Sequence, residues 1–148
     1  MLKTLFVLGK LAGFKANRDA ANEELRQAYQ QAYDLRLEAD AVVIKGAEQH
    51  NALMKDRFRN EGTNTAWYSF AGRDMSDRSV KAFLEENLKT SQTDVARLDS
   101  ATTIKSRLLR SSADEVERTG RARKSIASLS ALTEFATDMY TYRKEFGL

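Results

Sequence analysis

Residues 21–46, ANEELRQAYQQAYDLRLEADAVVIKG, contain the pattern that decides the predicted fold. Small or apolar residues recur there at alternating steps of four and three: Ala21, Leu25, Ala28, Ala32, Leu35, Ala39, Val42 and Gly46. Positions three and four apart share one face of a helix, and this spacing is typical of a coiled coil. Because most of these side chains are short, another helix can approach closely. We call the eight positions the small-residue seam and expect it to join the subunits of an oligomer.

The composition favours helices throughout. The chain has 148 residues, of which 42% are hydrophobic and 30% charged, with no proline, no cysteine and a formal net charge of +3. Without proline, nothing forces the backbone out of a helix. Without cysteine, a disulfide framework and thiol chemistry are excluded. We therefore predict an all-α fold, namely an elongated, long helical hairpin with additional N- and C-terminal helical segments.

Asn, Gly and Ser residues divide this helical pattern into segments. Residues 60–64 and Gly72 favour breaks, because Asn and Gly adopt the left-handed conformations that end helices. Ser76 and Asp77 are natural caps for the next helix, and residues 119–120 (Thr-Gly) are the expected kink or stop within it. The expected segments are a basic apolar head (1–16), a first long helix (17–60), an aromatic and glycine-rich connector (61–76) and a second long helical arm (77–148).

Two helices cannot enclose a core as four can, so each is expected to leave apolar surface outside the hairpin. Leaving several Leu and Phe side chains exposed to water would cost several kcal/mol of stability, at about 25 cal/mol per Å² of apolar surface. We therefore predict a homo-oligomeric ring or tube. Over residues 121–146, the expected apolar side consists of Ile126, Leu129, Leu132, Phe135, Ala136 and Met139.

Residues suited to catalysis are scarce. The one histidine, His50, has Leu53 and Met54 at the helical positions where a metal site would need further ligands, which favours a structural role. No phosphate-binding glycine motif and no nucleophile elbow occur. We expect no enzyme activity, no metal and no cofactor.

Three groups of residues are candidates for contacts with other molecules. A helical head would place apolar and small residues on one side, suited either to a membrane interface or to packing inside the assembly. The aromatic connector is expected to form a plug that folds back on the hairpin or docks into a neighbouring subunit, and a basic stretch over residues 105–124 could contact DNA. The membrane-contact candidates are Leu2, Leu5, Phe6, Gly9, Ala12 and Gly13; the plug is Trp67, Tyr68 and Phe70; the DNA-contact candidates are Arg118, Arg121, Arg123 and Lys124.

The order of these features resembles the small internal virion, or ejection, proteins of short-tailed phages that infect Gram-negative bacteria. The resemblance is carried by the short apolar head, the Ala- and Gln-rich helix at residues 28–32, the Ser-Phe-Ala-Gly turn at residues 69–72, the helix start at residues 80–84 and the Ser- and Ala-rich end. It implies a protein stored in the virion interior near the portal, together with other ejection proteins.

The resemblance further implies that the protein is expelled ahead of the genome. It would then assemble into a channel in the outer membrane and periplasm of the host, through which phage DNA passes without sequence specificity. Two alternatives remain from the residues themselves: a nucleic-acid-binding virion assembly factor, and a structural portal or tail adaptor without membrane activity.

Overall fold

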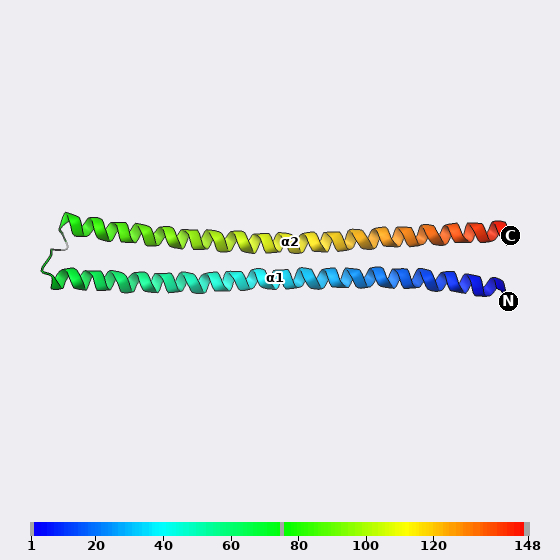
Figure 1. Cartoon of the computed structure of the whole chain (residues 1–148), viewed down its shortest axis with the longest axis horizontal. Helices are drawn as coiled ribbons and strands as arrows, with labels where there is room; N and C mark the ends of the chain where they lie inside the picture. The colour runs from blue at the N-terminus through cyan, green and yellow to red at the C-terminus, as the bar shows by residue number, and fades with distance from the viewer. Residues whose placement is uncertain (1, 75, 147–148) are drawn as a thin grey trace. The chain divides into compact units, whose positions relative to one another are not determined.

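The computed structural model describes residues 2–74 and 76–146, with side chains described for residues 8–74 and 76–144. In this part of the chain, helix α1 spans Leu2–Phe70 and helix α2 spans Arg78–Phe146, and no strand is present (Figure 1). The two helices pack against each other as an antiparallel hairpin. The prediction of an all-α helical hairpin is therefore confirmed.

Both helices are more continuous than expected. The predictions of a break at residues 60–64 and of a kink at Gly120 are wrong, because α1 continues to Phe70 and α2 continues through Gly120. The head is likewise part of α1, and the connector shrinks to residues 71–77. An unfavourable Gly costs a helix only about 1 kcal/mol, whereas restarting a helix repeats its costly nucleation. Within this stretch, the hydroxyl of Thr63 donates to the carbonyl of Arg59 at 2.9 Å, so its hydrogen bond stays within the helix.

A Schellman motif ends α1. The amide of Arg73 donates to the carbonyl of Tyr68 at 3.0 Å, and that of Gly72 donates to the carbonyl of Ser69 at 3.2 Å. Gly72 adopts a left-handed φ of 65°, which a glycine tolerates without steric cost. The expected stop at Gly72 is confirmed.

Asp77 caps the start of α2. Its Oδ1 accepts a hydrogen bond from the amide of Ser79 at 3.1 Å, and its carbonyl accepts one from the amide of Lys81 at 3.0 Å. Ser76 does not cap the helix and instead donates its amide to Oδ1 of Asp74 at 2.8 Å. That hydrogen bond lowers the pKa of Asp74. The expected cap is therefore confirmed for Asp77 and wrong for Ser76.

The hairpin comprises two compact units, each built from a stretch of α1 and a stretch of α2. Unit 1 combines Met1–Arg36 with Arg110–Leu148, and unit 2 is Leu37–Leu109. Small residues dominate the buried positions of both units. Those of unit 1 are Ala21, Ala28, Ala32, Ala113, Gly120, Ala131 and the ring of Tyr142; those of unit 2 are Ala39, Gly46, Val80 and Ser106.

The small-residue seam packs against α2 of the same chain. In unit 1, a Cβ atom placed on Gly120 would lie only 2.5 Å from the Cβ of Ala28, so the two backbones approach closely. In unit 2, Gly46 faces Thr102 in the same way. Close helix packing at the seam is thus confirmed, but its assignment as a contact between subunits is wrong. Helix α2 of the same chain covers these positions, and spacing alone does not predict whether the covering helix belongs to the same chain or to another copy.

The apolar side expected for the end of α2 is also wrong in part. Ile126, Leu129 and Leu132 are exposed, whereas Ala131 is buried. Of the expected set, Phe135 does turn inward, and its ring centroid lies 5.8 Å from that of Phe14. Because the helices approach closely at their small residues, the branched side chains are left on the outside.

Candidate functional site

Large apolar side chains lie exposed on both helices after the hairpin has formed. In unit 1, Ile126 is 67% and Tyr140 71% exposed. The exposed apolar residues of unit 1 are Leu8, Leu11, Tyr29 and Tyr33 on α1 and Ile126, Leu129, Leu132 and Tyr140 on α2; those of unit 2 along the helices include Leu37, Val43, Ile44, Phe58, Ile104 and Leu108. Single exposed apolar residues are normal on a protein surface, but repeated ones mark an interaction surface.

The exposed apolar residues of unit 1 occupy two different faces. Tyr29 on α1 lies on the same face as Arg121 on α2, because the Nε of Arg121 donates to the Tyr29 hydroxyl at 3.2 Å. Ile126 lies five positions beyond Arg121, which places it about 140° further around α2. We call these the tyrosine face, with Tyr29 and Tyr33, and the isoleucine face, with Ile126 and Leu129. By the same geometry Leu132 lies about 20° and Leu129 about 80° from Arg121, so the two faces adjoin each other around α2.

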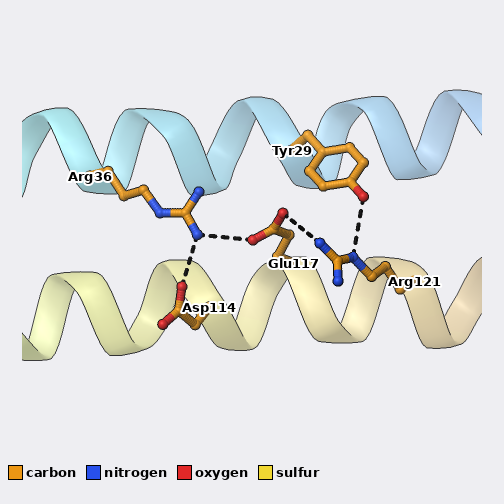
Figure 2. Close-up of polar contacts among 5 residues, drawn as sticks. All are labelled: Tyr29, Arg36, Asp114, Glu117 and Arg121. Carbon is orange, nitrogen blue, oxygen red and sulfur yellow. Dashed lines mark hydrogen bonds and ion pairs between the residues drawn. The ribbon is translucent and has the colours of Figure 1, made fainter.

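A network of charged groups spans the tyrosine face (Figure 2). Nη2 of Arg36 donates to Oδ1 of Asp114 at 2.8 Å and to Oε2 of Glu117 at 2.9 Å. Nη2 of Arg121 donates to Oε1 of Glu117 at 3.0 Å. The hydrogen bond from Arg36 is the main cause that lowers the pKa of Glu117, and the bond to Asp114 is the main cause that raises the pKa of Arg36. The network links α1 to α2 in unit 1.

The four DNA-contact candidates do not form one patch. Arg121 is engaged by Glu117 and Tyr29, and Lys124 is half-buried. Arg118 and Arg123 are exposed, but five positions separate them, so they point about 140° apart around α2. Arg118, Arg121 and Lys124, at steps of three, share one side of α2, whereas Arg123 points away from them.

The membrane-contact candidates are only partly within the described residues. The side chains of Leu2, Leu5 and Phe6 lie outside them, whereas Gly9, Ala12 and Gly13 are exposed. A Cβ on Gly9 or Gly13 would meet nothing within 4 Å, so their spacing does not serve a close helix contact here. Leu8 and Leu11, which were not among the predicted contacts, are exposed beside them and share a face by their spacing of three. Within the described residues, neither helix has a stretch long and apolar enough to cross a membrane.

The aromatic connector does not form a plug within the chain. Tyr68 is half-buried and packs edge-on against Phe83, with 6.0 Å between ring centroids. Trp67 and Phe70 are 60% and 92% exposed, so the expectation that they fold back is wrong. Because α1 continues through these residues, their positions around the helix are fixed, and only Tyr68 faces α2. Phe83 was not recognised as part of this cluster, although its ring meets Tyr68.

Polar groups between the helices of unit 2 form a pair and a pocket. Nδ1 of His50 lies 3.0 Å from Oδ1 of Asp99, and the described residues contain no group of three residues able to hold a metal. A pocket of about 500 Å³ is lined by Leu53, Asp56, Arg57, Asn60, Glu61, Thr63, Asn64, Leu84, Glu85, Asn87, Leu88, Thr90, Ser91 and Asp94. Nε of Arg57 is buried without a hydrogen-bond partner.

The described surfaces thus offer exposed apolar and aromatic side chains on both helices. Comparison of the chain with protein-family models, with curated protein sequences and with solved structures finds no match.

Proposed function

We propose that this chain is a non-enzymatic subunit of a homo-oligomeric assembly, and that the assembly is the channel of a phage ejection apparatus. The observation that carries the proposal is the large apolar surface that remains outside the closed hairpin, with Ile126, Leu129 and Tyr140 as its most exposed members in the last part of α2. An isolated copy would keep these side chains in water. Further copies of the same chain can cover them.

The free energy available from such contacts is substantial. Complete burial of a Leu, Ile or Phe side chain contributes about 1.5–3 kcal/mol. Ile126 and Leu129, already about one-third covered, would therefore contribute about 2–4 kcal/mol per copy on the isoleucine face alone. The tyrosine face adds a second contact of the same kind.

The arrangement of the two faces favours a ring. When a copy binds its neighbour through unlike surfaces, the contact is heterologous, and repetition closes into a ring or continues as a filament. A ring of helical hairpins surrounds a passage. This property supports the ejection role that the resemblance implies, with passage of phage DNA from the virion into the host.

In that role the protein resides first in the virion interior and then in the host cell envelope. Its partners are further copies of itself, other ejection proteins or the portal, the host membrane and the passing DNA. The dispersed positions of Arg118 and Arg123 agree better with passage of DNA than with an interface dedicated to binding it.

Sedimentation velocity of the purified protein tests the assembly. We expect oligomers at micromolar concentration and expect the double substitution Ile126→Ser with Leu129→Ser to shift them toward monomers, because both side chains are exposed and the hairpin core is untouched. The matched control is Arg118→Ser with Arg123→Ser, which alters two exposed positions of the same helix without removing apolar surface. A folded wild-type monomer over the whole concentration range would refute the proposal.

Release of a trapped dye from lipid vesicles tests the channel. We expect the wild-type protein to release the dye and the monomeric variant to release much less. Oligomers that leave vesicles intact would retain the assembly but refute the channel, and would favour the structural adaptor.

A further inference from the structure

We propose that the closed end of the hairpin is a lipid-contacting tip, in which Trp67, Tyr68, Phe70 and Phe83 enter the headgroup region of an anionic phospholipid surface. We call these four residues the aromatic tip. The inference rests on the proposed function, because it identifies the part of the chain through which the proposed assembly would contact the membrane. It differs from the sequence-based expectation, which placed that contact at the N-terminal head.

The aromatic tip is a preformed cluster of exposed rings. Tyr68 links the two helices, since its ring lies 5.1 Å from that of Trp67 and 6.0 Å from that of Phe83, both edge-on. Phe70 is the last residue of α1 and is almost completely exposed. Beside them, the Schellman motif ends α1 and Asp77 caps the start of α2. The rings therefore need no rearrangement before they meet a surface.

The chemistry of the rings suits a lipid headgroup region. Trp and Tyr carry an apolar ring with one polar group, and they are enriched where a membrane meets water. Phe70 and Phe83 supply apolar rings without a polar group. Together the four side chains form an element that can lie with its apolar parts toward the acyl chains and its polar atoms toward water.

Charge around the tip complements anionic phosphate groups. Arg73, Arg78 and Lys81 are exposed in the turn and the first turn of α2. The two carboxylates of the same stretch are directed to backbone amides, Asp74 to that of Ser76 and Asp77 to that of Ser79. Both carboxylates remain charged, so residues 73–81 carry three cations and two anions, a net charge of 3 − 2 = +1, which favours anionic phosphates next to the tip.

A second copy of the chain is a less suitable occupant of the tip. The buried centre of a protein interface is depleted in charged residues. Here five charged residues, at positions 73, 74, 77, 78 and 81, border the aromatic cluster within nine positions of sequence. Headgroups of phospholipids accept aromatic rings and cations side by side.

Fluorescence of Trp67 tests the inference directly, because it is the one tryptophan of the chain. We expect its emission to shift to shorter wavelength when the full-length protein meets vesicles of phosphatidylcholine and phosphatidylglycerol, and expect quenching by lipids brominated on their acyl chains. Pure phosphatidylcholine vesicles should give a weaker shift, and added salt should reduce the binding.

Substitution of Phe70 provides the second measurement. Phe70→Ser removes one exposed ring and should weaken vesicle partitioning about tenfold, with the circular dichroism of the hairpin unchanged. Phe58→Ser is the matched control, since Phe58 is also an exposed ring of α1 but lies three turns before the tip. Equal partitioning of the two variants would overturn the inference.

The outcomes separate this inference from the proposed function. Vesicle leakage with an unchanged Trp67 emission would overturn the tip and leave the channel standing, with another segment in contact with lipid. A shift of Trp67 emission that follows protein concentration in the absence of lipid would show that a second copy covers the tip, and would also overturn the inference. Absence of any vesicle binding by an oligomeric protein would overturn both the tip and the channel.

Discussion

The close approach of Gly120 to Ala28 makes a quantitative prediction for the substitution Gly120→Ala. At an unhindered position inside a helix, replacing glycine with alanine stabilises a protein by about 0.5–1 kcal/mol. At Gly120, however, the added Cβ would lie 2.5 Å from the Cβ of Ala28. That atom is attached directly to the α1 backbone and cannot rotate away. The helices must therefore separate.

Overpacking of this kind costs about 1–3 kcal/mol. We expect Gly120→Ala to lower the free energy of unfolding, by about 2 kcal/mol relative to an unhindered Gly→Ala change. The matched control is Gly62→Ala in α1, where the added Cβ would meet nothing within 4 Å, so this variant should be more stable than wild type. Urea unfolding followed by far-ultraviolet circular dichroism gives both values, at one fixed protein concentration because assembly contributes to apparent stability.

A double substitution tests the same contact in the opposite direction. Ala28→Gly combined with Gly120→Ala exchanges the two residues, so the total helix propensity is kept while the short Cβ–Cβ distance is removed. We expect this exchange to recover most of the stability lost by Gly120→Ala alone. The reasoning would be refuted if Gly120→Ala stabilised the protein as much as Gly62→Ala does, or if the exchange gave no recovery.

Substitutions probe three further contacts. Arg36→Gln removes the hydrogen bond that holds the pKa of Glu117 below its ordinary value of 4.5. The stability that this hydrogen bond provides is complete above pH 4.5 and is lost as the pH falls through the folded-state pKa of Glu117. The urea midpoint should therefore fall more steeply on acidification in wild type than in the variant, and equal slopes would contradict this. Asp77→Ala should cost about 1 kcal/mol through loss of the α2 cap while Asp77→Asn should be nearly neutral, as measured by thermal unfolding. Gly46→Ala should be destabilising because its Cβ would lie 2.5 Å from Oγ1 of Thr102, and Thr102→Ala should restore part of the loss in a double-mutant cycle.

Local signals in the sequence were sufficient to predict the helices and some of their ends. The seam residues, such as Ala28 and Ala32, mark a face of close helix contact, and both are buried. Gly72 and Asp77 mark the end of α1 and the start of α2, since a left-handed glycine and a capping carboxylate act through neighbouring backbone groups. The stops expected near Gly62 and at Gly120 failed because the propensity of one residue is small compared with the continuity of a long helix.

The partners of each face could not be predicted from local spacing. Ile126 and Ala127 are neighbours on α2, and either can begin an apolar stripe with helical spacing. Which of them turns inward depends on the small residues opposite them, far away in the sequence. The same limit applies to Trp67 and Phe70, because the sequence shows three aromatic residues together but not that only Tyr68 would face α2.

The ion pair between Lys10 and Asp138, 2.7 Å apart, brings the first turns of α1 alongside the last turns of α2. A flexible link could therefore join these stretches, and the chain could be opened instead in the turn after Gly72, since circular permutation is tolerated where chain ends lie close. The rearranged polypeptide would begin and end beside Trp67 and Phe70. Fusion partners or labels could then be attached at that end of the hairpin without altering either long helix.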